Sequence, residues 1–91
     1  MDYRIAFPEG MDDGDWAVQE AKGWVDVTVC WDGEERLLSF YDQTRLMQTI
    51  GHEMARTGYF AERSLVVVSA VTPENIEAAV AALAARGFVD I

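Results

Sequence analysis

Residues able to carry out nucleophilic, acid–base or metal chemistry are few in this 91-residue chain, which has one cysteine and one histidine. These two residues cannot supply the four ligands of a structural zinc site, and a single cysteine cannot close an intrachain disulfide. Cys30 lies in an apolar, β-branched run with no neighbouring base, so we expect it to pack as a small hydrophobe. His52 falls away from the apolar side of a predicted helix and is expected to be exposed.

The motifs that bind phosphate or present a nucleophile are absent, including G-x-x-x-x-G-K-S/T, G-x-G-x-x-G and G-x-S-x-G. Segment 12–15 (Asp-Asp-Gly-Asp) has the acidity of a calcium loop, but it lacks the alternating ligands and the closing glutamate. We therefore predict that the chain is not an enzyme and uses no cofactor and no metal ion. A ligand-binding or enzymatic domain that uses carboxylates with a cation is one alternative.

Acidic residues dominate the charge, with 16 Asp+Glu against 7 Lys+Arg and a formal net charge of −9. Residues 1–35 hold ten of the acids and only two bases, and segment 9–15 alone has four carboxylates. Such crowding of like charge opposes folding, so stability does not explain it. Two interpretations stand: a solvated loop that serves solubility, or an anionic surface presented to a basic partner.

The same composition excludes several partners. A nucleic-acid binder needs a basic face for phosphate contacts, and this charge balance does not provide one. No apolar run reaches the roughly 18–20 residues of a membrane span, and the N-terminus lacks the basic-then-apolar pattern of a signal peptide. We expect no nucleic-acid partner, no membrane partner and a cytoplasmic location.

The first half of the chain predicts mainly strands. Residues 3–7 alternate as a strand does and are followed by a loop at 8–14. Residues 24–31 and 36–42 predict the two strands of an antiparallel hairpin. Residues 15–22 fit two patterns, because Asp15 could cap a short helix while the residues that follow alternate as in a strand. We favour the strand.

The second half predicts two helices and a strand. Asp42 and Gly58 bound a helix with an apolar stripe formed by Leu46, Met47, Ile50 and Met54. Residues 64–71 are apolar without alternation, which is typical of a central strand covered on both faces. Thr72-Pro73-Glu74 begins a second helix that ends at Arg86. Residues 88–91 predict either an edge strand or a tail that places Phe88 in the core.

Together these elements predict a single α+β domain over residues 1–91, with a mainly antiparallel sheet and two helices packed on one face. Aromatic residues recur on both strand faces and cannot all be core in a domain of this size: Trp16, Trp24, Trp31 and Tyr41. Some of them could lie beside the acids and anchor a protein partner. Alternatively, they cover the open face of the sheet.

Several segments carry a family resemblance: Ser39–Asp42 leading into Arg45-Leu46, then Leu65–Val68, then Val71–Glu74 with Ile76 and Ala79-Val80. In element order, size and acidity, the chain resembles the small cytoplasmic immunity proteins of bacterial contact-dependent growth inhibition and related polymorphic toxin systems. The resemblance implies an inhibitor that binds the toxic C-terminal domain of a cognate effector. Such toxins are often nucleases with basic clefts.

The resemblance assigns no binding residues, so the predicted partner-binding site comes from charge and aromatic content. The predicted charge complements to a basic toxin domain are Glu9, Asp12, Asp13, Asp15, Asp32, Glu34 and Glu35. Trp16 and Trp31 are the predicted anchors. The alternative is a small self-associating accessory domain with no inhibitory role, a homodimer formed through a strand edge or the open sheet face.

Overall fold

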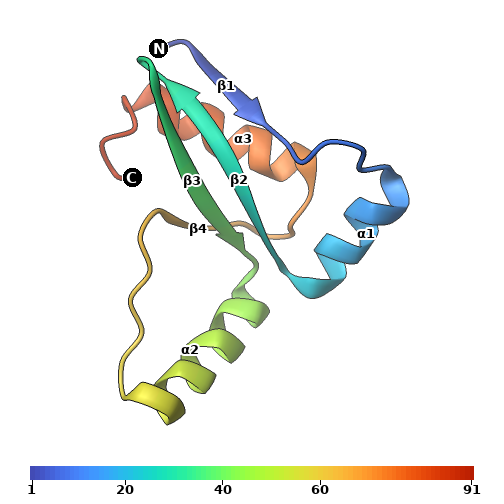
Figure 1. The fold of residues 1–91 in the computed structure, drawn as a ribbon, viewed down its shortest axis with the longest axis vertical. Helices are drawn as coiled ribbons and strands as arrows, with labels where there is room; N and C mark the ends of the chain where they lie inside the picture. Colours follow the sequence, from blue (N-terminus) through green and yellow to red (C-terminus); the bar gives the residue numbers. More distant parts are fainter.

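The computed structural model describes residues 1–91 and contains one four-stranded sheet and three helices. In chain order the elements are β1 (Tyr3–Ala6), α1 (Asp13–Lys22), β2 (Trp24–Trp31), β3 (Glu34–Tyr41), α2 (Gln43–Thr57), β4 (Leu65–Val67) and α3 (Pro73–Ala85). The strand order is β1-β2-β3-β4, with antiparallel pairs except for the parallel pair β3–β4 (Figure 1). The predicted α+β class is confirmed. None of the helices has the length and apolar character needed to cross a membrane.

The predicted β2–β3 hairpin forms, but its connection is shorter than the predicted residues 32–35, because β3 begins at Glu34 rather than Arg36. Its strands are paired from Trp24↔Tyr41 to Trp31↔Glu34, so two residues form the turn. Asp32 has φ 50° and Gly33 has φ 74°. Positive φ at both central positions defines the type I′ turn that Asp-Gly sequences favour, because its twist matches that of the strands.

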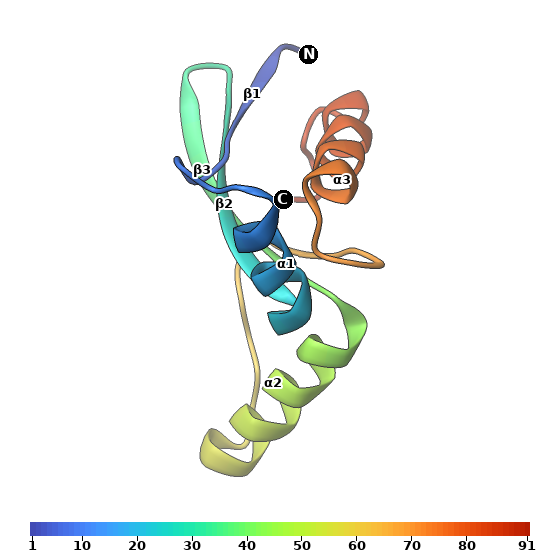
Figure 2. The same ribbon diagram turned by 90° about the vertical axis from the view of Figure 1, so that its right-hand side faces the viewer.

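The core lies between one face of the hairpin and α3. Val27 and Val29 on β2 and Leu38 and Phe40 on β3 are almost fully buried, because alternate residues point to the same face. Figure 2 shows α3 beside this face. The helix contributes Ile76, Val80 and Ala84, and the residues around it add Val68, Val71 and Phe88.

The strand predicted at residues 15–22 is wrong, because these residues lie in α1. The Asp12 carboxylate accepts a hydrogen bond from the Asp15 N–H at 2.8 Å, and the Asp15 carboxylate accepts one from the Asp12 N–H at 3.2 Å. Gly23 ends the helix in the left-handed region at φ 75°. These caps satisfy backbone groups that a helix otherwise leaves free, and they outweigh the short alternation of Trp16 and Val18.

The apolar run at residues 64–71 does not form a central strand. Only Leu65–Val67 pair with the sheet, in parallel with β3, and no strand lies beyond them. Val67 is consequently 47% exposed, while Val68 and Val71 leave the sheet and enter the core below α3. The C-terminal tail forms no strand. It buries Phe88, as one of the two predictions for it proposed.

The predicted helix between Asp42 and Gly58 has the expected bounds but does not pack on the sheet. Asp42 caps α2 by accepting a hydrogen bond from the Arg45 N–H at 2.7 Å, and Gly58 ends it at φ 83°. No residue of α2 is buried. Figures 1 and 2 show the helix projecting beyond the end of the sheet. Of the two predicted helices, α3 therefore packs on the sheet face and α2 does not.

Candidate functional site

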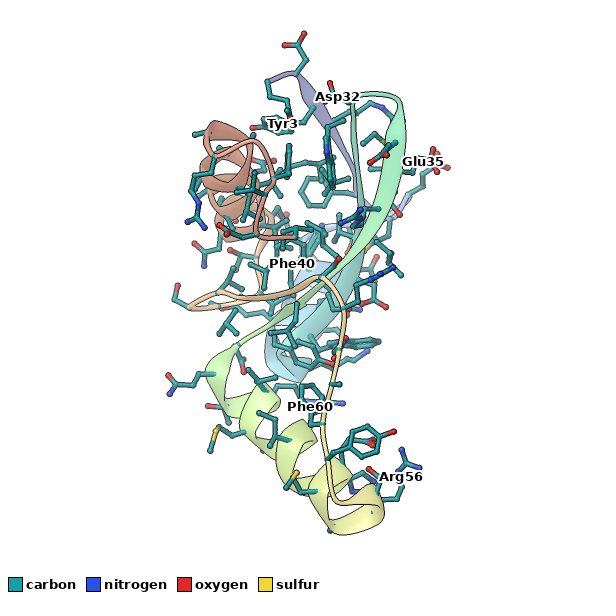
Figure 3. All side chains as sticks on the ribbon, turned by 90° about the vertical axis from the view of Figure 1, so that its left-hand side faces the viewer. Tyr3, Asp32, Glu35, Phe40, Arg56 and Phe60 are labelled. Carbon is teal, nitrogen blue, oxygen red and sulfur yellow. The ribbon has the colours of Figure 1, made fainter.

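The predicted acidic residues lie in two separate groups. Glu9, Asp12, Asp13 and Asp15 are exposed in the loop before α1 and in its first turn. Asp32, Glu34 and Glu35 are exposed at the β2–β3 turn. Figures 1 and 2 both place this turn at one end of the long axis and α1 farther along it, and Figure 3 shows Asp32 and Glu35 at the hairpin end. The fold therefore divides the predicted acidic surface.

The group at α1 borders a hollow of about 180 Å³ between that helix and the start of α3, which we name the acidic notch. Its lining residues are Asp13, Trp16, Ala17, Glu20, Thr72, Pro73 and Glu74. Three of the seven carry carboxylates and none carries a basic group. Because residues three, four and seven apart share one side of a helix, α1 presents Asp13, Trp16 and Glu20 together.

Helix caps fix both walls of the acidic notch. The capping box of Asp12 and Asp15 orients the first turn of α1, so these two carboxylates already have backbone partners. Across the notch, the Thr72 hydroxyl accepts a hydrogen bond from the Asn75 N–H at 3.2 Å, and Pro73 occupies the first turn of α3. Carboxylates in the first turn of a helix are favoured by its macrodipole. Asp13 and Glu74 therefore have a local structural reason to lie where they do, whereas Glu20, in the last turn of α1, has none.

Trp16 supplies the aromatic wall of the notch. Its ring meets the Phe7 ring edge to face, with centroids 5.6 Å apart and planes at 86°. It packs against the core and remains half-buried, so part of it borders the hollow. An aromatic face beside carboxylates suits the alkyl stem and cationic head of a lysine or arginine. Trp16 borders the hollow beside Asp13 and Glu20.

Trp31 lies in a different environment from the one that an anchor requires. It is 8% exposed and stacks on Phe88, with centroids 4.1 Å apart and planes at 14°. The Arg36 guanidinium lies 5.5 Å from the Trp31 centroid and donates a hydrogen bond to the Ile91 carbonyl at 2.6 Å. The prediction of Trp31 as an exposed anchor is wrong because the strand register places it on the core face with Val29.

The face of the sheet opposite α3 carries the remaining aromatic pair. Trp24 and Tyr41 are directly opposite on β2 and β3, with ring centroids 6.4 Å apart. Beside them, the Ser39 hydroxyl donates a hydrogen bond to the Asp26 carboxylate at 2.7 Å. Half-buried Cys30 lies on the same face. These aromatics cover sheet surface, which was the alternative to an anchoring role.

A second hollow, of about 380 Å³, lies between α2 and the segment that returns from it to β4. At its edge the Tyr41 hydroxyl donates a hydrogen bond to the Glu62 carboxylate at 2.9 Å. Burial, followed by this hydrogen bond and the negative charge of Glu62, raises the pKa of Tyr41 to about 12. The phenol therefore stays protonated at neutral pH and does not act there as a base. Glu53 and Arg56 also line this hollow, and the Arg56 guanidinium donates a hydrogen bond to the Glu53 carboxylate at 2.6 Å.

Two acids of the notch, Glu20 and Glu74, are missing from the predicted site. The helical spacing of Asp13, Trp16 and Glu20 was available in the sequence, but the strand assigned to 15–22 leaves Asp13 outside the element that carries Trp16 and Glu20. Glu74 follows the predicted start of α3, and only the tertiary fold brings that start to α1. The notch carboxylates line a hollow without converging, and no group of three or more His, Cys, Asp or Glu side chains is arranged to hold a metal ion.

Comparison of the chain with protein-family models, with curated proteins and with solved structures finds no match.

Proposed function

We propose that this chain is an acidic protein-interaction module, an immunity protein that binds and neutralises a basic bacterial toxin domain in the cytoplasm. The observation that carries the proposal is the acidic notch, where Asp13, Glu20 and Glu74 surround a hollow bordered by the Trp16 ring without a basic residue among its lining. A solubilising charge needs no such hollow and no adjacent aromatic ring. A nuclease toxin is the favoured partner, because it must carry basic groups to hold phosphates.

In the proposed complex, a lysine or arginine of the toxin domain enters the notch. Its alkyl stem packs on Trp16 and its charge lies among the three carboxylates. Glu9 and the hairpin acids Asp32, Glu34 and Glu35 lie outside the notch and are exposed. Charges of this kind at the rim of an interface mainly raise the association rate and set selectivity.

Inhibition follows from competition for the same basic groups. Carboxylates that pair with the basic residues of a nuclease cleft occupy the positions where substrate phosphates would bind. A standard interface buries about 800 Å² per partner, which is roughly one seventh of the 5731 Å² accessible surface of this chain. A domain of this size can therefore cover an active-site cleft with one face.

The test is neutralisation of a basic toxin domain, which the proposal predicts to be encoded beside this chain. Co-expression with the wild-type chain should restore growth, and the Glu20→Lys/Glu74→Lys double variant should fail to do so. We expect each reversal to weaken binding by about tenfold, since roughly 1.4 kcal/mol lies between the values for fully exposed ion pairs and for close interfacial charge pairs. Titration at rising salt should show a shallower salt dependence for the double variant.

A matched control is Glu77→Lys, which makes the same charge change at an exposed position of α3 outside the lining of the notch. It should retain binding within about threefold, as expected for a rim charge. Equal loss in the control and in the notch variants would assign the effect to net charge rather than to the notch. Persistent toxicity with the wild-type chain would refute the proposed function.

A further inference from the structure

Helix α2 is only partly packed in the single chain: Leu46 and Ile50 are half-buried, and its first turn contacts the end of α1 at Gly23. It has 15 residues, none of them fully buried, and it projects beyond the sheet in Figures 1 and 2. Isolated helices of about 12–15 residues are marginal in water, because nucleation is costly and little apolar surface is removed from solvent. Burial of the exposed apolar residues of α2 against another molecule would therefore stabilise this helix.

The outer side of α2 is apolar. Met47 is 63% exposed and Met54 is 49% exposed. We name Leu46, Met47, Ile50, Gly51 and Met54 the α2 stripe. At about 100° per residue, Arg45, His52 and Arg56 fall on roughly the opposite side of the helix from Met54. The positions nearest the two exposed methionines are uncharged, namely Gln43, Thr44 and Thr57, whereas the Glu53 carboxylate, paired with Arg56, lies beside Leu46 at one edge of the stripe. An uncharged surround of exposed methionines is typical of the centre of a protein interface.

Gly51 in the middle of this stripe has no explanation within the chain. A glycine inside a helix is less favourable than alanine, and a Cβ added at Gly51 would meet no atom within 4 Å. No packing contact in the single chain therefore excludes a side chain there. Close approach of a second helix would exclude one, because a glycine lets two helix backbones come near each other.

Charge identifies the occupant of this stripe. Residues 43–64 hold three arginines and two glutamates, whereas the other residues hold fourteen acids and four bases. A second copy of this chain would meet net repulsion at most surfaces but not at α2. Figure 3 shows Arg56 on α2, far from Asp32 and Glu35 at the hairpin end. A basic toxin domain, in contrast, would gain no electrostatic attraction at α2, because residues 43–64 carry no excess of negative charge.

We infer that the chain forms a symmetric homodimer through antiparallel pairing of its α2 stripes, a contact that goes beyond the proposed neutralising function. With the twofold axis near Ile50 and Gly51, Met47 faces the partner subunit's Met54, and the reverse contact follows by symmetry. A 15-residue helix is about 22 Å long, so antiparallel pairing keeps the acidic bodies at opposite ends. This length exceeds the screening length of about 8 Å at physiological salt. Both acidic notches remain free.

Sedimentation equilibrium of the full chain tests the inference. The wild-type chain should give twice the 10.2 kDa chain mass, and Met47→Glu/Met54→Glu should give the chain mass with unchanged sheet signal in circular dichroism. The control is Leu37→Glu, which places a charge on a side chain that is 55% exposed on the open sheet face. It should leave the dimer intact. A wild-type monomer up to about 1 mM, where even a weak dimer would be populated, would overturn the inference. So would a dimer that Leu37→Glu disrupts and the α2 variant does not.

Cross-linking gives a second measurement that does not depend on a destabilising charge. In a Cys30→Ala background, Ile50→Cys places a thiol beside the twofold axis and keeps Gly51, whereas Arg56→Cys places it on the side of α2 away from Met54. Mild oxidation should cross-link the Ile50→Cys chain at least tenfold faster than the Arg56→Cys chain. Equal rates would contradict antiparallel pairing through the stripe.

Discussion

Substitution of Gly23 by alanine should destabilise the fold more than the same change at Gly33, although both glycines have nearly the same backbone conformation. Gly23 has φ 75° and Gly33 has φ 74°. The left-handed conformation costs a residue with a Cβ about 1–2 kcal/mol, so this penalty is common to both positions. Any difference between them must come from the space around the new methyl group.

The space at Gly23 is already occupied. A Cβ there would lie 2.5 Å from Oδ2 of Asp42 and 2.8 Å from the Cβ of Arg45, whereas a Cβ at Gly33 meets nothing within 4 Å. Asp42 cannot move freely, because its carboxylate caps α2 and its N–H donates a hydrogen bond to the Gly23 carbonyl at 2.9 Å. Loss of a cap costs about 0.5–2 kcal/mol, and overpacking costs about 1–3 kcal/mol.

We therefore expect Gly23→Ala to lower the free energy of unfolding by about 2–5 kcal/mol and Gly33→Ala by about 1–2 kcal/mol. Urea titration followed by circular dichroism measures both values, and an unchanged slope shows that the compactness of the two states is preserved. Equal destabilisation by the two substitutions would refute the close approach of α1 and α2 at Gly23. That approach helps to orient α1, and with it one wall of the acidic notch.

Three further substitutions test separate parts of the structure. Gly51→Ala should raise the helical signal of dilute chain and stabilise α2 by about 1 kcal/mol, yet weaken self-association; stronger self-association would contradict the inferred close contact. In a spectroscopic titration, Tyr41→Phe should remove the phenolate signal that appears near pH 12. Because folding raises the pKa of Tyr41, its contribution to stability is complete below its unfolded value near 10 and is lost between about pH 10 and pH 12. Ile76→Ala should cost about 2–5 kcal/mol in urea titration, whereas Val89→Ala, at a side chain that is 78% exposed, should change stability by less than about 0.5 kcal/mol.

Elements whose first and last residues are set by contacts with nearby residues in the chain were predictable from the sequence. Asp42 and Gly58 bound α2 through side-chain and backbone contacts within a few residues, so its limits could be predicted without the tertiary fold. The existence of the hairpin was predictable from local signals too, but its connection was predicted over residues 32–35, whereas only Asp32 and Gly33 form the turn. The packing of α2 was not predictable, since an apolar stripe shows that a face avoids water but not which molecule covers it.

Features that depend on distant residues were missed or misplaced. Val66 and Val67 form part of an apolar run typical of a central strand, but the sheet ends at β4 because no further strand exists to pair with it. At α1, the alternation of Trp16 and Val18 favoured a strand, although the caps at Asp12 and Gly23 made a helix. That error also separated Asp13 from Trp16 and Glu20, because the predicted strand began at Asp15 whereas the helix begins at Asp13 and brings the three together.

The acids and the apolar stripe differ in how they should respond to salt, and this difference separates their two proposed roles. Screening weakens attraction between the acidic notch and a basic partner, so that complex should dissociate more readily as salt rises. The proposed dimer buries uncharged residues while it brings together two chains of net charge −9, so screening removes repulsion between them. Its dissociation constant should therefore stay constant or fall over the same range. If both associations weaken in parallel with salt, charge rather than apolar contact holds the copies together, and the assignment of the α2 stripe as their interface fails.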